Sequence, residues 1–154
     1  ADVAAKHKTG LVLMHSRGEF ETLHSQPKIP DMMAEVAADF RRSINAARNG
    51  GVQSENIALD VGIGFGKTLD QNLELIAKLD DLVAEFAAFP LLVGTSRKSF
   101  IGKLLDGAPP DERLAGSLAK AAIAVWNGAK ILRVHDVKET VQALQIVAAI
   151  KNEA

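Results

Sequence analysis

The fold of this chain is decided by one stretch, Phe89-Pro90-Leu91-Leu92-Val93-Gly94-Thr95-Ser96-Arg97-Lys98-Ser99-Phe100-Ile101-Gly102. Residues 90–93 form a short apolar run without polar alternation, which is typical of a strand buried on both faces of a parallel sheet. Residues 94–99 then supply small, hydroxylic and basic side chains where the next helix would begin, and a helix start attracts anions through its free N–H groups and its dipole. The stretch predicts a buried strand that leads into an anion-binding loop, with merely solvated basic side chains as the alternative.

The same pattern occurs at three other places in the chain. Residues 11–14 are followed by His15-Ser16-Arg17-Gly18, residues 56–59 by Asp60 and the glycine-rich segment 61–67, and residues 130–132 by Arg133-Val134-His135-Asp136. Each run is followed by a segment with helical periodicity. This order is typical of repeated β-α units with a parallel sheet, in which the carboxyl ends of the strands carry the site.

Periodicity and helix-boundary residues predict the helices that separate these strands. We expect them at residues 1–8, 31–48, 70–89, 99–105, 109–127 and 137–150. Met33, Phe40, Phe86 and Trp126 lie in these patterns and are expected in the core. The last helix carries its apolar residues at the same helical spacing: Val141, Leu144, Ile146, Val147 and Ile150.

The composition excludes several classes of protein. With 47% hydrophobic residues, 24% charged residues and a formal net charge of −1, neither disorder nor a general affinity for nucleic acid or anionic membranes is expected. There is no membrane-length apolar run and no cysteine, which excludes disulfides and thiolate metal sites and makes a reducing cytoplasm the expected location. The four histidines, His7, His15, His24 and His135, lie on separate elements, so no histidine metal site is expected.

The length accounts for half of a barrel. The predicted strands begin near residues 11, 57, 90 and 130, whereas an eight-stranded (β/α)8 barrel takes about 250 residues. We therefore expect residues 1–154 to be a piece of a longer protein without the N-terminal half of its barrel. Half a barrel has open strand edges and exposes barrel-facing side chains, here Leu13, Leu59, Val93 and Leu132 or their neighbours. This predicts a homo-oligomer, for which two facing halves are one arrangement, or a crystallised piece whose open face is covered by neighbouring chains.

Four motifs together carry a specific resemblance. Residues 60–67, 91–99, 112–117 and 133–136, in this order and spacing, resemble the C-terminal half of dihydropteroate synthase, the sulfonamide target of folate synthesis. The resemblance covers essentially the whole chain. Val61 departs from the family, which usually has proline after the aspartate; this loss is expected to loosen the turn and keep the carboxylate.

The resemblance implies an α/β fold, the C-terminal half of a TIM-type (β/α)8 barrel, and a transferase as the parent enzyme. That enzyme joins 7,8-dihydropterin-6-ylmethyl diphosphate to 4-aminobenzoate and releases diphosphate with the help of Mg2+. The family's metal loop belongs to the N-terminal half, so the Mg2+ ligand is expected there and the isolated chain is expected to be inactive. The alternative is a non-catalytic pterin- or anion-binding half-barrel related to the pterin-binding domains of methyltransferases.

The resemblance also assigns catalytic roles to Asp60, Lys98 and Arg133 and substrate-binding roles to residues around them. Asp60 would accept the pterin N–H groups and stabilise positive charge on the ring, and Lys98 would contact both pterin and the aminobenzoate ring. Phe65 resembles the apolar wall under the aminobenzoate, and Ser99 at a helix start suits its carboxylate. Met14 lines either the pterin pocket or an ordinary barrel core.

Arg133 and His135, two residues apart on a predicted strand, would point to one side and hold the diphosphate. Arg97 would either add positive charge or form a surface ion pair. Thr95 and Ser96 would either assist substrate binding or cap the loop. Gly94 is assigned to substrate binding as part of the same motif. His15 and Arg17 are expected to stabilise a loop as a pair.

Overall fold

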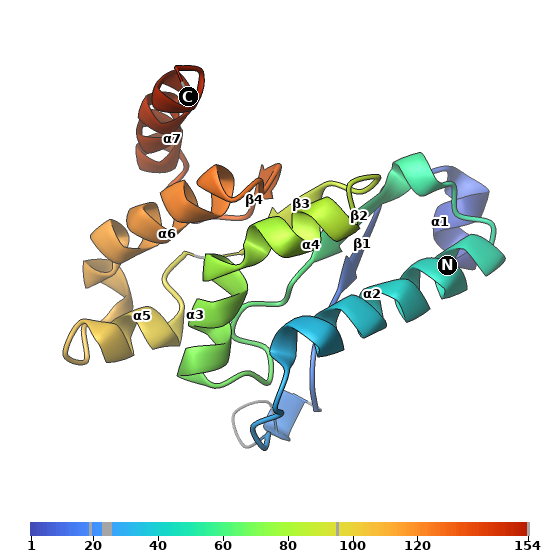
Figure 1. Ribbon diagram of the computed structural model, residues 1–154, viewed down its shortest axis with the longest axis horizontal. Helices are drawn as coiled ribbons and strands as arrows, with labels where there is room; N and C mark the ends of the chain where they lie inside the picture. The colour runs from blue at the N-terminus through green and yellow to red at the C-terminus, as the bar shows by residue number, and fades with distance from the viewer. Residues whose placement is uncertain (19, 23–25, 95, 154) are drawn as a thin grey trace.

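A computed structural model describes residues 1–18, 20–22, 26–94 and 96–153 of the chain. Four strands form one sheet (Figure 1): β1 (Leu11–Met14), β2 (Ile57–Asp60), β3 (Leu91–Val93) and β4 (Ile131–Leu132). They follow the order β1-β2-β3-β4, and every neighbouring pair is parallel. The predicted repeat of β-α units is confirmed.

The helices lie between the strands as predicted, and local signals explain where two of them start. The Asp31 side chain caps its helix by accepting a hydrogen bond from the Ala34 N–H, and Thr68 forms a capping box with Gln71. The helices are α1 (Asp2–His7), α2 (Met32–Asn49), α3 (Leu69–Ala77), α4 (Leu79–Glu85), α5 (Ser99–Leu104), α6 (Leu114–Trp126) and α7 (Val137–Lys151). Three short 3-10 helices cover Phe20–Thr22, Ser54–Asn56 and Pro110–Glu112.

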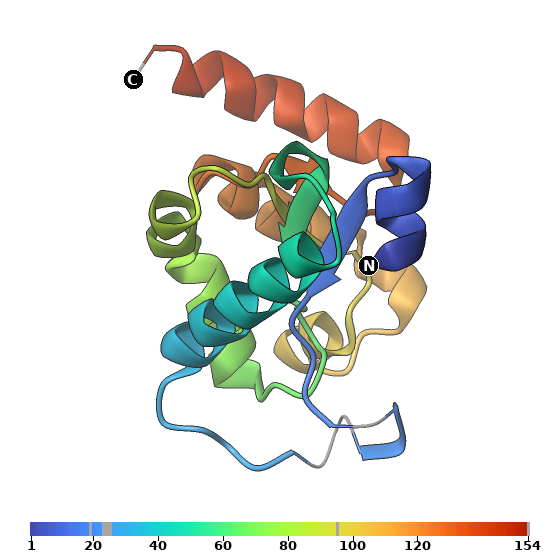
Figure 2. The same cartoon turned by 90° about the vertical axis from the view of Figure 1, so that its right-hand side faces the viewer.

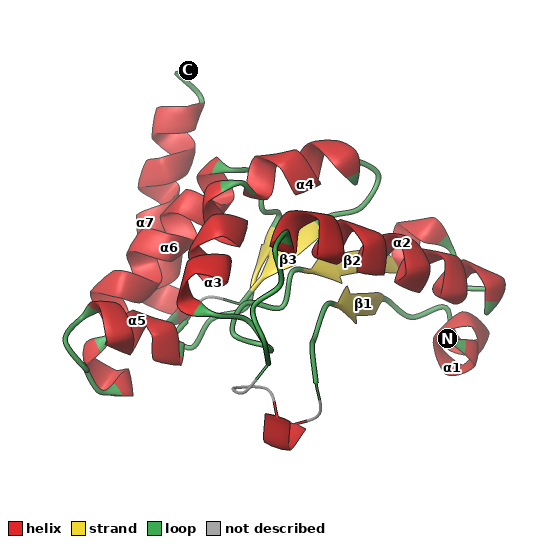
Figure 3. Ribbon diagram, turned by 60° about the horizontal axis from the view of Figure 1, so that its bottom comes forward, coloured by secondary structure: helices red, strands yellow, loops and turns green. Residues whose placement is uncertain are grey.

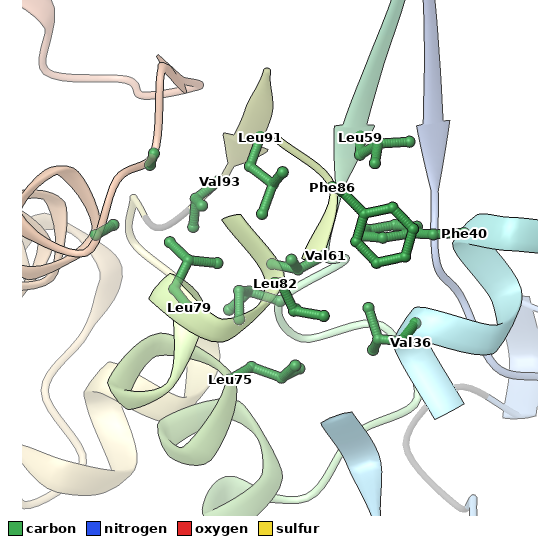
Figure 4. Packing of buried hydrophobic residues seen from close by; sticks show 14 of the residues in the cluster. Val36, Phe40, Leu59, Val61, Leu75, Leu79, Leu82, Phe86, Leu91 and Val93 are labelled. Atoms are coloured by element: carbon green, nitrogen blue, oxygen red, sulfur yellow. The ribbon is translucent and has the colours of Figure 1, made fainter. Parts of the chain in front are cut away.

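The core lies between the sheet and the helices on one of its faces. Figures 1 and 3 show α2, α3 and α4 over this face, and Figure 4 shows the side chains that meet there. The rings of Phe40 and Phe86 pack edge to face with centroids 5.4 Å apart, which adds specific geometry to a large apolar burial. The sheet is thereby fixed against its outer helices, and this fixes where its strands end.

The opposite face of the sheet is open. Val12 is 50% exposed and Met14 39%, whereas Leu59 and Val93 are fully buried. Because side chains alternate along a strand, the open face belongs to the neighbours of the four residues first expected there. Leu13, Leu59, Val93 and Leu132 instead join or pack against the core on the helix-covered side.

One predicted helix is two helices in the structure. The segment expected at residues 70–89 breaks at Lys78, whose backbone (φ −108°, ψ 25°) ends α3 and starts α4. The amide of Asn127 reaches across from the end of α6 and donates to the carbonyls of Ile76 (2.8 Å) and Ala77 (3.2 Å). These contacts satisfy carbonyls near the break.

The expectation that Trp126 lies in the core is wrong, since it is 48% exposed at the end of α6. In α7, Thr140 is buried, whereas Val141, Ile146 and Ile150 are exposed. Helix α7 packs against α6 and otherwise runs along the edge of the molecule (Figures 1 and 2). No described helix combines the length and the hydropathy that crossing a membrane requires.

Candidate functional site

The site begins where the strands end, as expected for parallel β-α units. Met14 and Asp60 are register partners on β1 and β2, and Asp60 and Leu92 are partners on β2 and β3, so the three side chains share the open face. Asp60 is buried, and its Oδ1 accepts a hydrogen bond from the Gly62 N–H at 2.8 Å. The Asp60 carboxylate is thus held in place at the carboxyl end of β2.

A glycine-rich loop of residues 61–67 folds tightly over this end of the sheet. Gly62 has a φ of +65°, and a Cβ placed there would lie 1.8 Å from the His15 carbonyl oxygen, so no side chain fits. The loop is tied down on both sides: the Arg17 guanidinium donates to the Gly66 carbonyl at 3.1 Å, and the Gly64 N–H donates to the Asn72 Oδ1 at 2.7 Å. This packing fixes the loop that carries Phe65.

Lys98 lies against Phe65, with its amine 4.5 Å from the centre of the ring, a cation–π geometry. Burial lowers the pKa of Lys98, the nearby charge of Arg133 lowers it further, and the Asp60 carboxylate raises it. Ser99, the first residue of α5, is exposed and lines a cavity of about 470 Å3 together with Lys67, Phe100 and Lys103. An aromatic wall, a cation and a helix start are therefore adjacent.

A smaller cavity of about 130 Å3 lies beside Lys98 and is lined by Gly94, Ser96, Lys98, Arg133, Val134 and His135. A Cβ on Gly94 would lie 3.1 Å from the Arg133 guanidinium, so the glycine leaves room for that cation. The Ser96 Oγ accepts from the His135 N–H at 3.2 Å and lies 3.0 Å from its Nδ1. The cavity presents the cations of Lys98 and Arg133 and an imidazole, which suits an anion.

Arg97 has a different position from its neighbours. Its left-handed backbone (φ 54°) carries the guanidinium toward Asp136, whose two carboxylate oxygens it contacts at 3.1 and 2.5 Å. The hydrogen bond from Arg97 holds the pKa of the Asp136 carboxyl below its usual range. Arg97 therefore forms an ion pair and lies outside the lining of the small cavity, while its N–H and carbonyl bind Ser117 and Arg113.

The structure brings most of the predicted site residues to the carboxyl ends of the parallel strands. Met14 lies on the open face beside Asp60, and Arg133 and His135 line one cavity, although β4 already ends at Leu132. Thr95 lies outside the described residues. The expected pairing of His15 with Arg17 is wrong: Arg17 binds the glycine loop, whereas both ring nitrogens of the buried His15 have no hydrogen-bond partner.

Sequence reasoning assigned no role to two lysines near the site. Burial lowers the pKa of Lys67 to about 7 and, together with the charge of Lys98, that of Lys120 to about 7. Lys67 could have been noticed as the basic residue that ends the glycine-rich loop. Lys120, whose amine lies 3.9 Å over the Phe100 ring, gives no such signal because it lies inside an apolar helix pattern.

Among the described residues, no three His, Cys, Asp or Glu side chains lie close enough together to hold a metal ion. The acidic groups near the site do not provide such a cluster either, since Asp60 binds the Gly62 N–H and Asp136 binds Arg97. What the arrangement offers is a buried carboxylate, an aromatic wall and a cationic cavity. These groups can bind an aromatic heterocycle with N–H donors beside an anion.

The sequence and the fold of this chain are similar to those of known dihydropteroate synthases. The chain is 48% identical over 150 residues to dihydropteroate synthase of Escherichia coli K12, covering 96% of this chain and 51% of that protein. It superposes on Yersinia pestis dihydropteroate synthase in complex with a sulfonamide drug (TM-score 0.93, 42% identity, 98% of this chain and 54% of the other). The Xanthomonas albilineans enzyme with 4-aminobenzoic acid gives a TM-score of 0.88 at 38% identity, covering 97% and 52%.

This chain thus spans about half the length of the curated relatives it matches. Its four parallel β-α units correspond to half of the dihydropteroate synthase barrels on which they superpose. Residues 1–135 match the pterin binding enzyme family, from the first helix through the strand end that carries Arg133 and His135. The chain belongs to the pterin binding enzyme family.

Proposed function

We propose that this chain forms half of the active site of a dihydropteroate synthase. The observation that carries the proposal is a buried carboxylate, a lysine stacked on an aromatic ring and an arginine–histidine cavity, all at the carboxyl ends of the parallel strands. Two related structures support it, since the Yersinia pestis enzyme is in complex with a sulfonamide drug and the Xanthomonas albilineans enzyme with 4-aminobenzoic acid.

In the proposed reaction the amine of 4-aminobenzoate attacks the methylene carbon of the pterin diphosphate. A carbon–nitrogen bond forms, the carbon–oxygen bond to diphosphate breaks, the diphosphate leaves with the electron pair, and the amine loses a proton. Asp60 accepts N–H groups of the pterin and stabilises the positive charge that develops on the ring as the carbon–oxygen bond breaks. Lys98 and Phe65 hold the aminobenzoate ring between a cation and an apolar wall.

Arg133 and His135 hold the diphosphate in this scheme. The guanidinium presents a fork of N–H donors to phosphate oxygens, and the Ser96 hydroxyl fixes the orientation of the imidazole through its contact with Nδ1. Holding the leaving group stabilises the negative charge that it gains as the bond breaks. In this scheme Ser99, the first residue of α5, binds the aminobenzoate carboxylate.

Magnesium and assembly complete the proposal. The described residues contain no cluster suited to Mg2+, so no step here is routed through the ion, and its ligand is proposed to lie in the other half of the barrel. We also propose that the chain forms homo-oligomers, since one face of its sheet is open. A non-catalytic pterin- or anion-binding half-barrel is the competing function, and it requires the same pocket without turnover.

Calorimetry on the purified chain tests the binding half of this proposal. We expect 6-hydroxymethylpterin and inorganic diphosphate to bind at separate subsites, and Arg133→Met to weaken diphosphate by about tenfold or more with little effect on the pterin. Lys6→Met, which removes an exposed lysine of α1 outside the site, serves as the matched charge control. If the wild-type chain binds neither ligand, or if both lysine and arginine variants lose diphosphate equally, the proposed site is wrong.

A further inference from the structure

Lys67 lies beside the site, and the proposed reaction gives it no role. Its amine donates to three backbone carbonyls: Gly62 at 2.8 Å, Phe65 at 3.2 Å and His15 at 3.4 Å. Gly62 and Phe65 belong to the β2–α3 loop, and His15 follows β1. One side chain therefore joins the glycine-rich loop to itself and to the neighbouring strand end.

These contacts close a ring that includes the carboxylate. The His15 N–H donates to the Asp60 carbonyl at 3.0 Å, the Asp60 side chain accepts from the Gly62 N–H, and the Gly62 carbonyl accepts from Lys67, which also reaches the His15 carbonyl. The Phe65 N–H donates to the same Gly62 carbonyl at 3.1 Å. Movement of Gly62 would therefore disturb both Asp60 and Phe65.

The contacts suit a charged amine. An ammonium group has three donors and no acceptor, and three carbonyl oxygens surround this one. Burial is the largest influence on the Lys67 pKa and lowers it to about 7, while the carboxylates of Asp60 and Asp39 raise it and the cations of Arg17 and Lys98 lower it. The charge is thus present below neutral pH and is lost above it.

We propose that Lys67 is a positioning residue: its ammonium group holds the β2–α3 loop in the shape that keeps the Asp60 carboxylate and the Phe65 ring in place for the pterin and the aminobenzoate. The identity of the two ligands rests on the proposed function. The contacts by which Lys67 holds the loop do not depend on it. Lys67 itself touches neither substrate in this scheme and acts through the backbone of Gly62 and Phe65.

The test compares Lys67→Met, which removes the donors, with Lys67→Arg, which keeps a charge, and with Lys6→Met on exposed α1 as control. Amide hydrogen exchange measured by NMR should show the Gly62 N–H at least tenfold less protected in Lys67→Met, with the Leu59 amide in β2 unchanged. The affinity for 6-hydroxymethylpterin should fall by about tenfold, with partial recovery in Lys67→Arg and no change in Lys6→Met.

A second measurement needs no variant. In the wild-type chain, Gly62 exchange corrected for its intrinsic pH dependence should accelerate as the pH rises through about 7, where Lys67 loses its proton. Unchanged Gly62 protection across this pH range, or in a folded Lys67→Met chain, would overturn the positioning role. If the wild-type chain binds no pterin, the proposed function fails, while Gly62 protection still decides the role of Lys67.

Discussion

Asp60 combines two hydrogen-bonding tasks in one buried carboxylate, since it holds the Gly62 N–H and is proposed to bind the pterin. Asp60→Asn keeps the size of the side chain but removes its charge and one acceptor. We expect pterin affinity to fall by about 2 kcal/mol, close to thirtyfold, as for a charged hydrogen bond left unpaired. Calorimetry measures this loss, and diphosphate binding in the same variant is the internal control; an unchanged pterin affinity would assign Asp60 a structural role only.

His15 makes the stability of the fold depend on pH. Its ring is 1% exposed, and burial, together with the charge of Lys67, lowers its pKa from 6.5 to about 4. The unfolded chain therefore binds a proton at His15 that the folded chain rejects between these two values, so stability is complete above pH 6.5 and falls as the pH drops toward 4. The difference corresponds to about 3 kcal/mol.

Urea denaturation at several pH values separates this contribution from that of the carboxylates. His15→Leu should lose less stability than the wild type between pH 6.5 and 4, because it has no ring to protonate. His7→Leu, on the exposed surface of α1, should behave like the wild type. If the free energy of unfolding falls equally with pH in all three proteins, protonation of His15 does not destabilise the folded chain.

At this scale the sequence predicts side chains that carry their own chemistry. Asp60, Lys98, Arg133 and His135 follow strand ends, and parallel topology then brings them together. Lys67 escapes such reasoning because its partners are backbone carbonyls, whose directions depend on the positive φ values of the loop. Arg97 also has a positive φ, which directs its guanidinium to the Asp136 carboxylate. The sequence alone therefore left open whether Arg97 lines the cavity or forms an ion pair.

Among the elements, the break between α3 and α4 depends on a residue from a third helix. Asn127→Ala removes two hydrogen bonds to the carbonyls of Ile76 and Ala77, and we expect a loss of about 1–2 kcal/mol in the free energy of unfolding. Urea denaturation measures it, with Asn45→Ala on the exposed side of α2 as control. Equal stabilities for the two variants would mean that water satisfies these carbonyls equally well.

Apolar periodicity predicted the strands and nearly every helix, because these elements bury one face against the sheet. It failed where an apolar stripe has no partner. Trp126 and the apolar residues of α7 follow the same pattern as core helices, yet α7 has α6 beside it and little else among the described residues. A sequence pattern records that a face is apolar, and it does not record which chain or segment covers it.

For the whole molecule, the sheet carries half of the proposed site on an open face. Stabilising a transition state requires all groups in place at once, and the described residues supply the carboxylate, the lysine and the diphosphate cavity without a metal cluster. We expect the purified chain to show little or no synthase turnover with both substrates and Mg2+. Robust turnover in a preparation free of the host enzyme would show that these residues, or assemblies of this chain, are sufficient.

Exposed apolar side chains lie on both edge strands of the sheet. Val12 and Met14 are exposed on the edge strand β1, and Ile131 is exposed on β4 at the other edge of the sheet. Sequential parallel order allows β4 of one copy to pair with β1 of another, so that two copies close a ring of eight strands. Light scattering should therefore give a mass above 16.4 kDa at micromolar concentration, and Val12→Lys should return it to the monomer, while Val3→Lys on exposed α1 should not. A compact wild-type monomer that binds no hydrophobic dye would contradict this prediction, because apolar edges of this kind do not remain in water without a partner.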